Sequence, residues 1–158
     1  MVTMSEVTQA GPPGLVRCTG YVFGHAGLLL LEAVERALAP HRLQMRHVAV
    51  MLILDSSQRP LSQQELSGML ALDPARMVAV VDQLEELKYA HRQRNPGDRR
   101  RYIVSLTARG RKALDAAMKD VDDAEARFLE PLDSEEREQL GQSARRLMEP
   151  HWLAAAPP

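Results

Sequence analysis

The apolar and polar positions of the chain follow two different periods. Apolar residues recur at steps of three and four from Met77 to Leu87, which predicts a helix with one buried face. Tyr102, Val104 and Leu106 lie at every second position, the period of a half-buried strand. The pattern over the whole chain predicts helices over residues 15–39, 45–54, 63–71, 74–87, 108–130 and 133–148.

Short motifs mark where several of these helices begin. Ser62 and Glu65 have the spacing of a capping box. Asp73 followed by Pro74 is an N-cap with proline at the first helical position. Thr107 can cap the helix that follows the strand. Two short helices separated by a brief turn and followed by a hairpin predict a winged helix-turn-helix, whose second helix enters the DNA major groove.

The hairpin tip carries the most unusual composition of the chain. Pro96 and Gly97 fit the centre of a type II turn. Three consecutive arginines follow, Arg99–Arg101, and the strand comes directly after them. Like charges held together at a tight tip are costly unless they meet anions, so the tip predicts insertion into a DNA groove.

Residues 61–110 resemble the MarR family of bacterial transcription regulators. The wing signature of that family, Asp-x-Arg followed by a strand and Leu-Thr-x-x-Gly, is present as Asp98, Arg100, Leu106, Thr107 and Gly110. The resemblance extends over residues 15–150 and implies a mainly α fold with a small β-wing. The recognition helix of the family usually ends at glycine, whereas this chain has Lys88 there, so we expect a strained or altered helix end.

The resemblance also implies an organisation in one domain with an added dimerisation layer. The winged helix-turn-helix, which binds DNA, is expected over residues 41–107. N- and C-terminal helices, over residues 14–40 and 108–150, are expected to form the dimerisation layer of a homodimer on a palindromic operator. Residues 1–13 and 151–158 are expected to be flexible tails.

Charge supports the DNA-binding interpretation. The chain has a net charge of −1, but residues 88–112 carry nine basic residues and one acid, a net charge of +8. Such a basic hairpin in a near-neutral protein is typical of DNA binding. Residues 115–149 carry eleven acids and five bases, so these helices should point away from DNA. A winged-helix module that binds protein is the alternative, although a basic tip has no purpose there.

Other function classes find little support. The sequence has no phosphate loop, nucleophile elbow or zinc-hydrolase spacing, so we do not expect an enzyme. The single cysteine fits a reducing cytoplasm. The apolar run over residues 19–31 is too short for a membrane span, and no membrane partner is expected.

The predicted base-reading residues lie on the outer face of the second helix. Arg76, Ala79 and Gln83 are opposite its apolar face, and Ala75 is adjacent. Arginine can bind guanine and glutamine can bind adenine through two hydrogen bonds each.

The other predicted contacts go to the DNA backbone and the minor groove. In the family the residue at Arg100 enters the minor groove and the residue at Asp98 orients it. The predicted phosphate contacts, which position the protein without specifying sequence, are Ser62, Arg92, Arg94, Arg99 and Arg101.

Many MarR-like regulators release DNA when a small aromatic or phenolic ligand binds between the dimer helices and the winged module. No cofactor is required. The residues expected to line such a pocket are His25, Leu28, Met45, His47 and Met51. A zinc-responsive regulator is an alternative with His25, His41 and His47 as ligands, because neutral imidazoles bind zinc well. The histidine pair that zinc-sensing relatives carry after the wing is missing.

A redox-responsive regulator is the remaining alternative. Cys18 lies near the position of the reactive cysteine in peroxide-sensing relatives. Its neighbours Leu15, Val16, Tyr21 and Val22 predict a buried thiol, and burial makes a thiol unreactive. We therefore expect operator binding that does not respond to peroxide.

Overall fold

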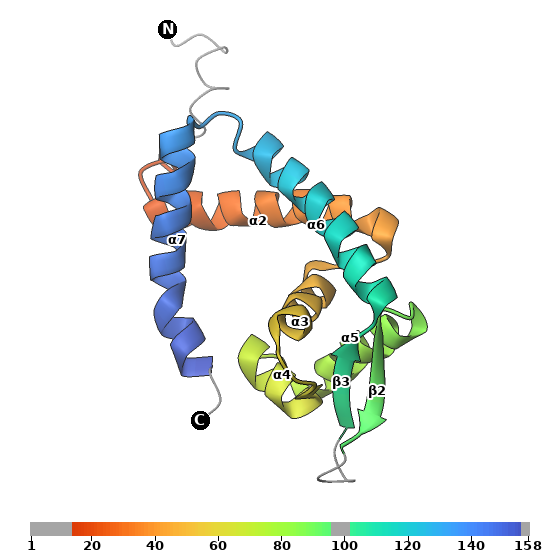
Figure 1. The fold of residues 1–158 in the computed structure, drawn as a ribbon. Helices are drawn as coiled ribbons and strands as arrows, with labels where there is room; N and C mark the ends of the chain where they lie inside the picture. Colours follow the sequence, from red (N-terminus) through yellow and green to blue (C-terminus); the bar gives the residue numbers. More distant parts are fainter. Residues whose placement is uncertain (1–13, 96–101, 156–158) are drawn as a thin grey trace, which may run out of the picture.

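The structure is a computed structural model that describes residues 14–95 and 102–155. Its elements, in chain order, are α2 (Thr19–Leu38), η1 (Ala39–His41), α3 (Met45–Ser56), β1 (Leu61–Ser62), α4 (Gln63–Leu70), α5 (Pro74–Glu86), β2 (Ala90–Arg94), β3 (Tyr102–Leu106), α6 (Ala108–Phe128) and α7 (Ser134–Ala155). Figure 1 shows α2 across one end of the molecule and α6 crossing it, with α3, α4, α5 and the strands grouped beneath. This arrangement confirms the predicted mainly α fold with a small β-wing.

Four of the helices end within two residues of the predicted limits, and two differ more. The first begins at Thr19, because residues 14–17 form a turn and Cys18 takes an extended backbone as the N-cap. The last continues to Ala155 with Pro150 inside it, so residues 151–155 are helical and not the predicted tail. Residues 1–13 and 156–158 lie outside the described part of the chain.

The strands form a three-stranded antiparallel sheet in the order β1-β3-β2. Leu61 of β1 faces Val104 of β3, a pairing that the sequence pattern did not predict. Val104 and Leu106 are buried as their alternation predicts, whereas Tyr102 is exposed because it lies where the hairpin leaves the core. The predicted turn at Pro96 and Gly97 lies outside the described residues.

The hydrophobic core sits beneath the recognition helix. It combines α3, α4, α5 and β3 with one side of α6 and the C-terminal end of α2. Its largest fully buried side chains include Leu38, Met51, Leu66, Met77 and Leu84. Packing against this core holds α5 in place, with its outer face turned away from the core.

The Leu-Thr-x-x-Gly signature joins the wing to α6. Thr107 Oγ1 accepts the Gly110 N–H at 2.9 Å and donates to the Lys88 carbonyl at 2.8 Å. A Cβ on Gly110 would overlap the Tyr89 carbonyl oxygen, so only glycine fits this approach. Lys88 has φ of 62°, which confirms a non-glycine residue in the left-handed position at the end of α5.

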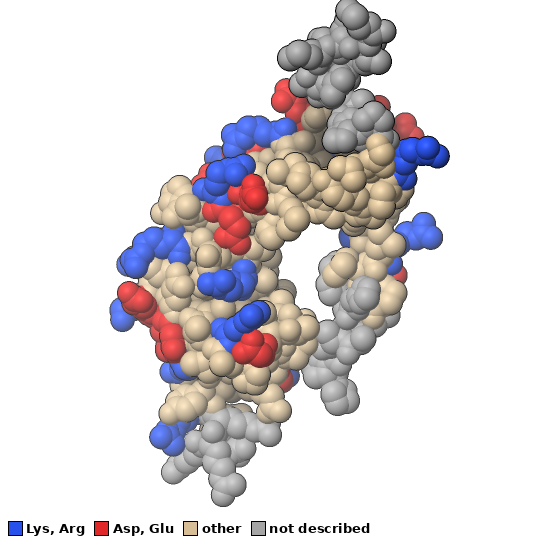
Figure 2. All heavy atoms as spheres, turned by 180° about the vertical axis from the view of Figure 1, so that it is seen from behind, with Lys and Arg blue, Asp and Glu red and all other residues tan. Residues whose placement is uncertain are grey.

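Two helices leave apolar side chains exposed. On α2 these include Tyr21, Phe23 and Leu28, and on α7 they include Leu147 and Met148. In the space-filling view, the surface around α2 is largely tan, whereas charged side chains are spread over the winged part (Figure 2). No helix among the described residues is long and apolar enough to cross a membrane.

Candidate nucleic-acid interface

The turn between α4 and α5 is held by local hydrogen bonds. Ala71 adopts φ of 49°, and the Leu72 N–H donates to the Ser67 carbonyl at 3.1 Å. Asp73 then caps α5 by accepting the Arg76 N–H at 3.0 Å. The predicted cap is confirmed, and it fixes where the outer face of α5 begins.

The recognition helix α5 has one buried and one exposed face. Met77 and Val81 are fully buried. Ala75, Arg76 and Ala79 are exposed, as the helical period predicts. Arg76 Nε lies 3.1 Å from Asp73 Oδ2, and its side chain is still 78% exposed. Since a guanidinium carries five N–H donors, this contact leaves donors of Arg76 for other acceptors.

Gln83 occupies a more enclosed place than the other predicted base-reading residues. It is half-buried, and its side-chain amide donates to the Arg42 carbonyl at 3.1 Å. This hydrogen bond ties the last turn of α5 to the turn after η1. It uses one of the two N–H groups of the Gln83 amide, so a base contact does not require that Arg42 be released.

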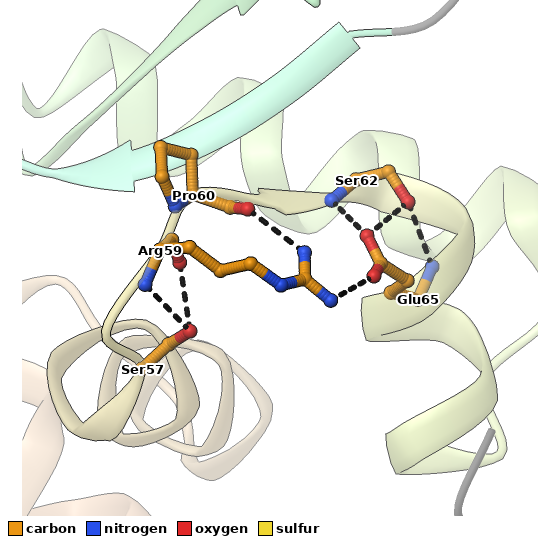
Figure 3. A network of polar contacts seen from close by, with 5 residues as sticks. All are labelled: Ser57, Arg59, Pro60, Ser62 and Glu65. Carbon is orange, nitrogen blue, oxygen red and sulfur yellow. Dashed lines mark hydrogen bonds and ion pairs between the residues drawn. The ribbon is translucent and has the colours of Figure 1, made fainter. Parts of the chain in front are cut away.

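Ser62 is engaged within the chain instead of being available to a phosphate. Its hydroxyl and its backbone N–H both donate to Glu65 Oε2 at 2.7 Å, and it is only 6% exposed. Arg59 approaches Glu65 from the other side and also donates to the Pro60 carbonyl (Figure 3). The hydrogen bonds from Arg59 and then Ser62 lower the pKa of Glu65 to about 2. The capping box thus uses both donors of Ser62 in the free chain, and its phosphate contact stays a prediction.

Arg92, another predicted phosphate contact, is also paired within the chain. Its side chain is 19% exposed and turns onto the outer side of α5, where it pairs with Asp82 and Glu85. Glu85 additionally accepts the Arg92 backbone N–H at 2.7 Å. The positive charge is thus neutralised by two acids of the recognition helix, which attach β2 to α5.

The described end of the wing keeps one exposed arginine. Arg94 lies 5.8 Å from the centre of the Tyr102 ring across the β2–β3 pair. The remaining predicted wing contacts, Asp98, Arg99, Arg100 and Arg101, lie outside the described residues.

The basic character of residues 88–112 is partly cancelled in space. Besides Arg92, Arg111 pairs with Asp55 of α3 at 3.1 Å. Figure 2 shows basic and acidic side chains intermixed over the face opposite that of Figure 1. A charge count along the chain therefore overstates the local positive charge.

The five residues predicted to line an effector pocket are spread over different surroundings. His25 and Leu28 are exposed on α2, and His25 stacks on Tyr21 with ring centres 5.8 Å apart. Met51 is fully buried in the core, and Met45 is half-buried. These side chains therefore lie in different surroundings within one chain, and their role in an effector pocket stays a prediction.

The histidines predicted as zinc ligands are likewise separated. His41 Nε2 lies 2.6 Å from Asp120 Oδ2 on α6, whereas His47 is fully buried at the start of α3. The described residues contain no group of three histidine, cysteine or acidic side chains that could hold a metal ion. The predicted set of His25, His41 and His47 is therefore wrong within one chain, because each has a different neighbour.

Cys18 is exposed, so the prediction of a buried thiol is wrong. The reason is that α2 begins at Thr19 instead of residue 15, so Cys18 is the N-cap, and the apolar side chains around it belong to a face that the chain leaves uncovered.

A cavity of about 500 Å³ lies between the start of α3 and the outer face of α5. We call it the α3–α5 cavity. It is lined by Arg46, His47, Leu72, Arg76, Ala79, Val80 and Gln83.

Sequence reasoning missed two kinds of residue near this interface. Asp82 and Glu85 form the acidic pair that binds Arg92, and their spacing of three residues on one helix was the available signal. Arg46 lines the cavity from the first turn of α3, and nothing in its local sequence distinguishes it from other exposed arginines.

The paired short helices, the outward face of α5 and the sheet-based wing define a winged helix-turn-helix protein. The MarR family matches residues 43–102 of the chain. The HTH-type transcriptional repressor NicR of Pseudomonas putida is 31% identical over 121 residues, covering 72% of this chain and 75% of NicR. The transcriptional regulator HosA of Escherichia coli is 35% identical over 74 residues, 47% of this chain, and that match spans 55% of HosA.

Solved structures agree with this similarity. The transcriptional repressor CouR bound to a 23-mer DNA duplex has a TM-score of 0.76 at 29% identity, covering 93% of this chain and 98% of CouR. CouR from Rhodococcus jostii RHA1 bound to p-coumaroyl-CoA has a TM-score of 0.71 at 28% identity, covering 86% and 95%. The chain belongs to the MarR family of DNA-binding transcriptional regulators.

Proposed function

We propose that the chain is a homodimeric repressor that binds a palindromic DNA operator and responds to a small effector. The outward face of α5 carries this proposal. Arg76 and Ala79 are exposed on it, while Met77 and Val81 anchor the opposite face in the core. This face can enter a major groove without disturbing the fold, and NicR and CouR are both repressors.

The uncovered apolar surface supports dimerisation. Large apolar side chains exposed on or next to α2 and on α7 are Leu15, Val16, Tyr21, Val22, Phe23, Leu28, Leu29, Leu31, Leu140, Leu147 and Met148. Contiguous apolar surface of this kind marks an interface. A second copy would cover it, and two-fold symmetry would double the DNA contacts on a palindrome.

The proposed DNA contacts fall into three groups. Ala75, Arg76, Ala79 and Gln83 meet bases in the major groove. Arg94 meets a phosphate beside the wing. At the tip, Arg100 enters the minor groove with Asp98 as its orienting partner, flanked by Arg99 and Arg101. The protein then acts in the cytoplasm, where bacterial DNA lies.

The effector is proposed to be a phenolic or aromatic compound. CouR is described in complex with p-coumaroyl-CoA, which contains a phenolic group. Leu28 and His25 lie on the face of α2 that a partner would cover, and Met45 begins α3 in the winged part. An effector held where these elements meet in the dimer would change the spacing of the two recognition helices.

Selection of binding sites from random DNA, followed by anisotropy titration, tests this proposal. We expect a palindrome with half-site centres about 10 bp apart. Affinity should fall by roughly 10³–10⁵ between 50 and 200 mM salt if six to ten phosphates are neutralised. Arg76→Ala should lose about 1–3 kcal/mol of preference at particular base pairs. Lys119→Ala, which removes an exposed cation of α6, is the control and should leave that preference unchanged. Absence of salt-dependent DNA binding would instead favour a protein-binding module.

A further inference from the structure

The chain joins the winged part to the long helices at two places. One is Thr107, between β3 and α6, and the other is residues 39–44, between α2 and α3, which we call the α2–α3 turn. At the first place, the backbone of Gly110 packs so closely against the Tyr89 carbonyl that a Cβ would not fit, and this packing fixes the start of α6. The α2–α3 turn is held differently, by polar contacts with other helices.

Two neighbouring residues of the α2–α3 turn contact two different helices. His41 Nε2 lies 2.6 Å from Asp120 Oδ2 of α6, and the His41 side chain is only 19% exposed. The Arg42 carbonyl accepts a hydrogen bond from the Gln83 amide of α5 at 3.1 Å. The Arg42 guanidinium lies 3.9 Å from Glu86 Oε1, also on α5. The turn therefore connects the recognition helix with α6 through side chains that are distant in the sequence.

The backbone of the α2–α3 turn is itself restricted. The ring of Pro40 sets its φ, and Arg42 has φ of 58°, in the left-handed region that favours glycine. The Leu43 N–H donates to the Leu38 carbonyl at 3.3 Å, which closes the turn. A left-handed residue other than glycine costs free energy, and the contacts that the turn makes with α5 and α6 offset this cost.

We propose that the α2–α3 turn sets the angle between α5 and α6, with His41 and Arg42 as positioning residues. In a dimer built on the long helices, this angle decides how far apart the two recognition helices lie. Each α5 enters the groove of its own half-site, so a fixed angle selects one half-site spacing over its neighbours. Only the step from this angle to half-site spacing rests on the proposed function.

The first measurement needs no DNA. Val78→Cys on α5 and Ala116→Cys on α6, both at exposed positions, carry spin labels in a chain in which Cys18 is replaced by serine. The labelled chain is diluted into excess unlabelled protein, so that pulsed electron paramagnetic resonance reports the distance within one chain. We expect one narrow distance distribution, which becomes broader in His41→Ala and in Asp120→Ala.

A double variant separates a broken contact from a general loss of structure. If His41 and Asp120 act through each other, the variant with both changed to alanine broadens the distribution no more than either single change does. Asp123→Ala removes an exposed acid of the same helix and is the control, which should leave the distribution unchanged. Urea unfolding checks that each variant folds.

The second measurement compares the selected operator with one whose half-site centres are moved apart by a single base pair. In His41→Ala, the preference for the selected spacing should fall about tenfold, because a hydrogen bond to a carboxylate is lost. Glu86→Gln should reduce the preference less, because the side chains of Arg42 and Glu86 are 71% and 73% exposed. A general loss of stability would lower the affinity for both operators alike and leave their ratio unchanged.

Broader distance distributions together with a reduced spacing preference support the positioning role. Unchanged distributions in both His41→Ala and Asp120→Ala overturn it, whether or not DNA is bound. Broader distributions with an unchanged spacing preference also overturn it, because α5 would then find its groove without the turn. If the variants broaden the distribution but wild-type protein binds no DNA, the α2–α3 turn still sets the angle and the proposed function fails.

Discussion

The winged part and the long helices α2 and α7 use apolar residues in opposite ways. In the winged part, apolar side chains with helical spacing are buried by the chain itself, as Leu66 and Leu84 show. On α2, Leu28 has the same kind of spacing and is 61% exposed. Periodicity therefore identifies the apolar face of a helix, but not which molecule covers that face.

Charged residues differ between the same two regions. In the winged part, Arg92, Arg59 and Arg111 each pair with acids of another element or loop. On α2, Arg36 pairs with Glu32 of the same helix, and both side chains are largely exposed. Charge in the winged part thus positions elements against each other, whereas charge on α2 is mostly solvated.

Replacing a glycine by alanine in each region should separate the two regions most clearly. Gly110→Ala places a methyl group against the Tyr89 carbonyl and near Leu106, and should lower the free energy of unfolding by about 1–3 kcal/mol. Gly24→Ala meets nothing within 4 Å in its own chain, so its intrinsic effect should be a gain of about 0.5–1 kcal/mol. Urea unfolding at two protein concentrations measures both.

The two glycines should also respond differently to dilution. The loss at Gly110 arises within one chain and should not depend on protein concentration. Any loss at Gly24 acts through a partner chain and should vary with concentration. A concentration-independent loss at Gly24 as large as that at Gly110 would contradict an uncovered α2 face.

A smaller effect is expected at the arginine that joins the wing to the recognition helix. Arg92→Gln leaves Asp82 and Glu85 without their cation and should lower the free energy of unfolding by about 1–2 kcal/mol. The salt dependence of DNA binding should stay the same. Arg94→Gln, two residues along the same strand, should instead reduce that dependence by about one ion per protomer.

The two arginine variants are compared by urea unfolding and by anisotropy titrations at several salt concentrations. A reduced salt dependence in Arg92→Gln with unchanged stability would restore the phosphate contact that the sequence predicts. It would also show that the ion pairs of Arg92 open when DNA binds.

Local features were predictable from sequence, and partners distant in the chain were not. Ser62, Asp73 and Thr107 cap their helices as predicted, because a cap depends on residues within one turn. The role of Arg92 was missed, because its acids lie on a different element. The exposure of Cys18 could not be predicted, because apolar neighbours in the sequence do not show whether the folded chain covers them. Tertiary contacts decide such cases.

The last pair of variants compares two capping boxes, one in the winged part and one at the start of α7. Glu65 accepts the Ser62 N–H and is bound by Arg59, and Glu136 makes the same kind of contact with the Asp133 N–H in α7. The pKa of Glu65 is lowered to about 2 from an ordinary value of 4.5, so its carboxylate stabilises the folded chain above pH 4.5. This stabilisation should be lost as the pH falls from 4.5 towards 2.

Glu65→Gln removes that pH-dependent part and should cost about 1 kcal/mol near neutral pH, with little difference from wild type near pH 2. Glu136→Gln is the matched substitution, because its box lacks the arginine that Figure 3 shows beside Glu65. Chemical unfolding at pH 7 and pH 3 should therefore show a smaller pH-dependent difference for Glu136→Gln. Equal differences for both variants would mean that Arg59 adds no stability, and that the Glu65 cap is no stronger than the Glu136 cap.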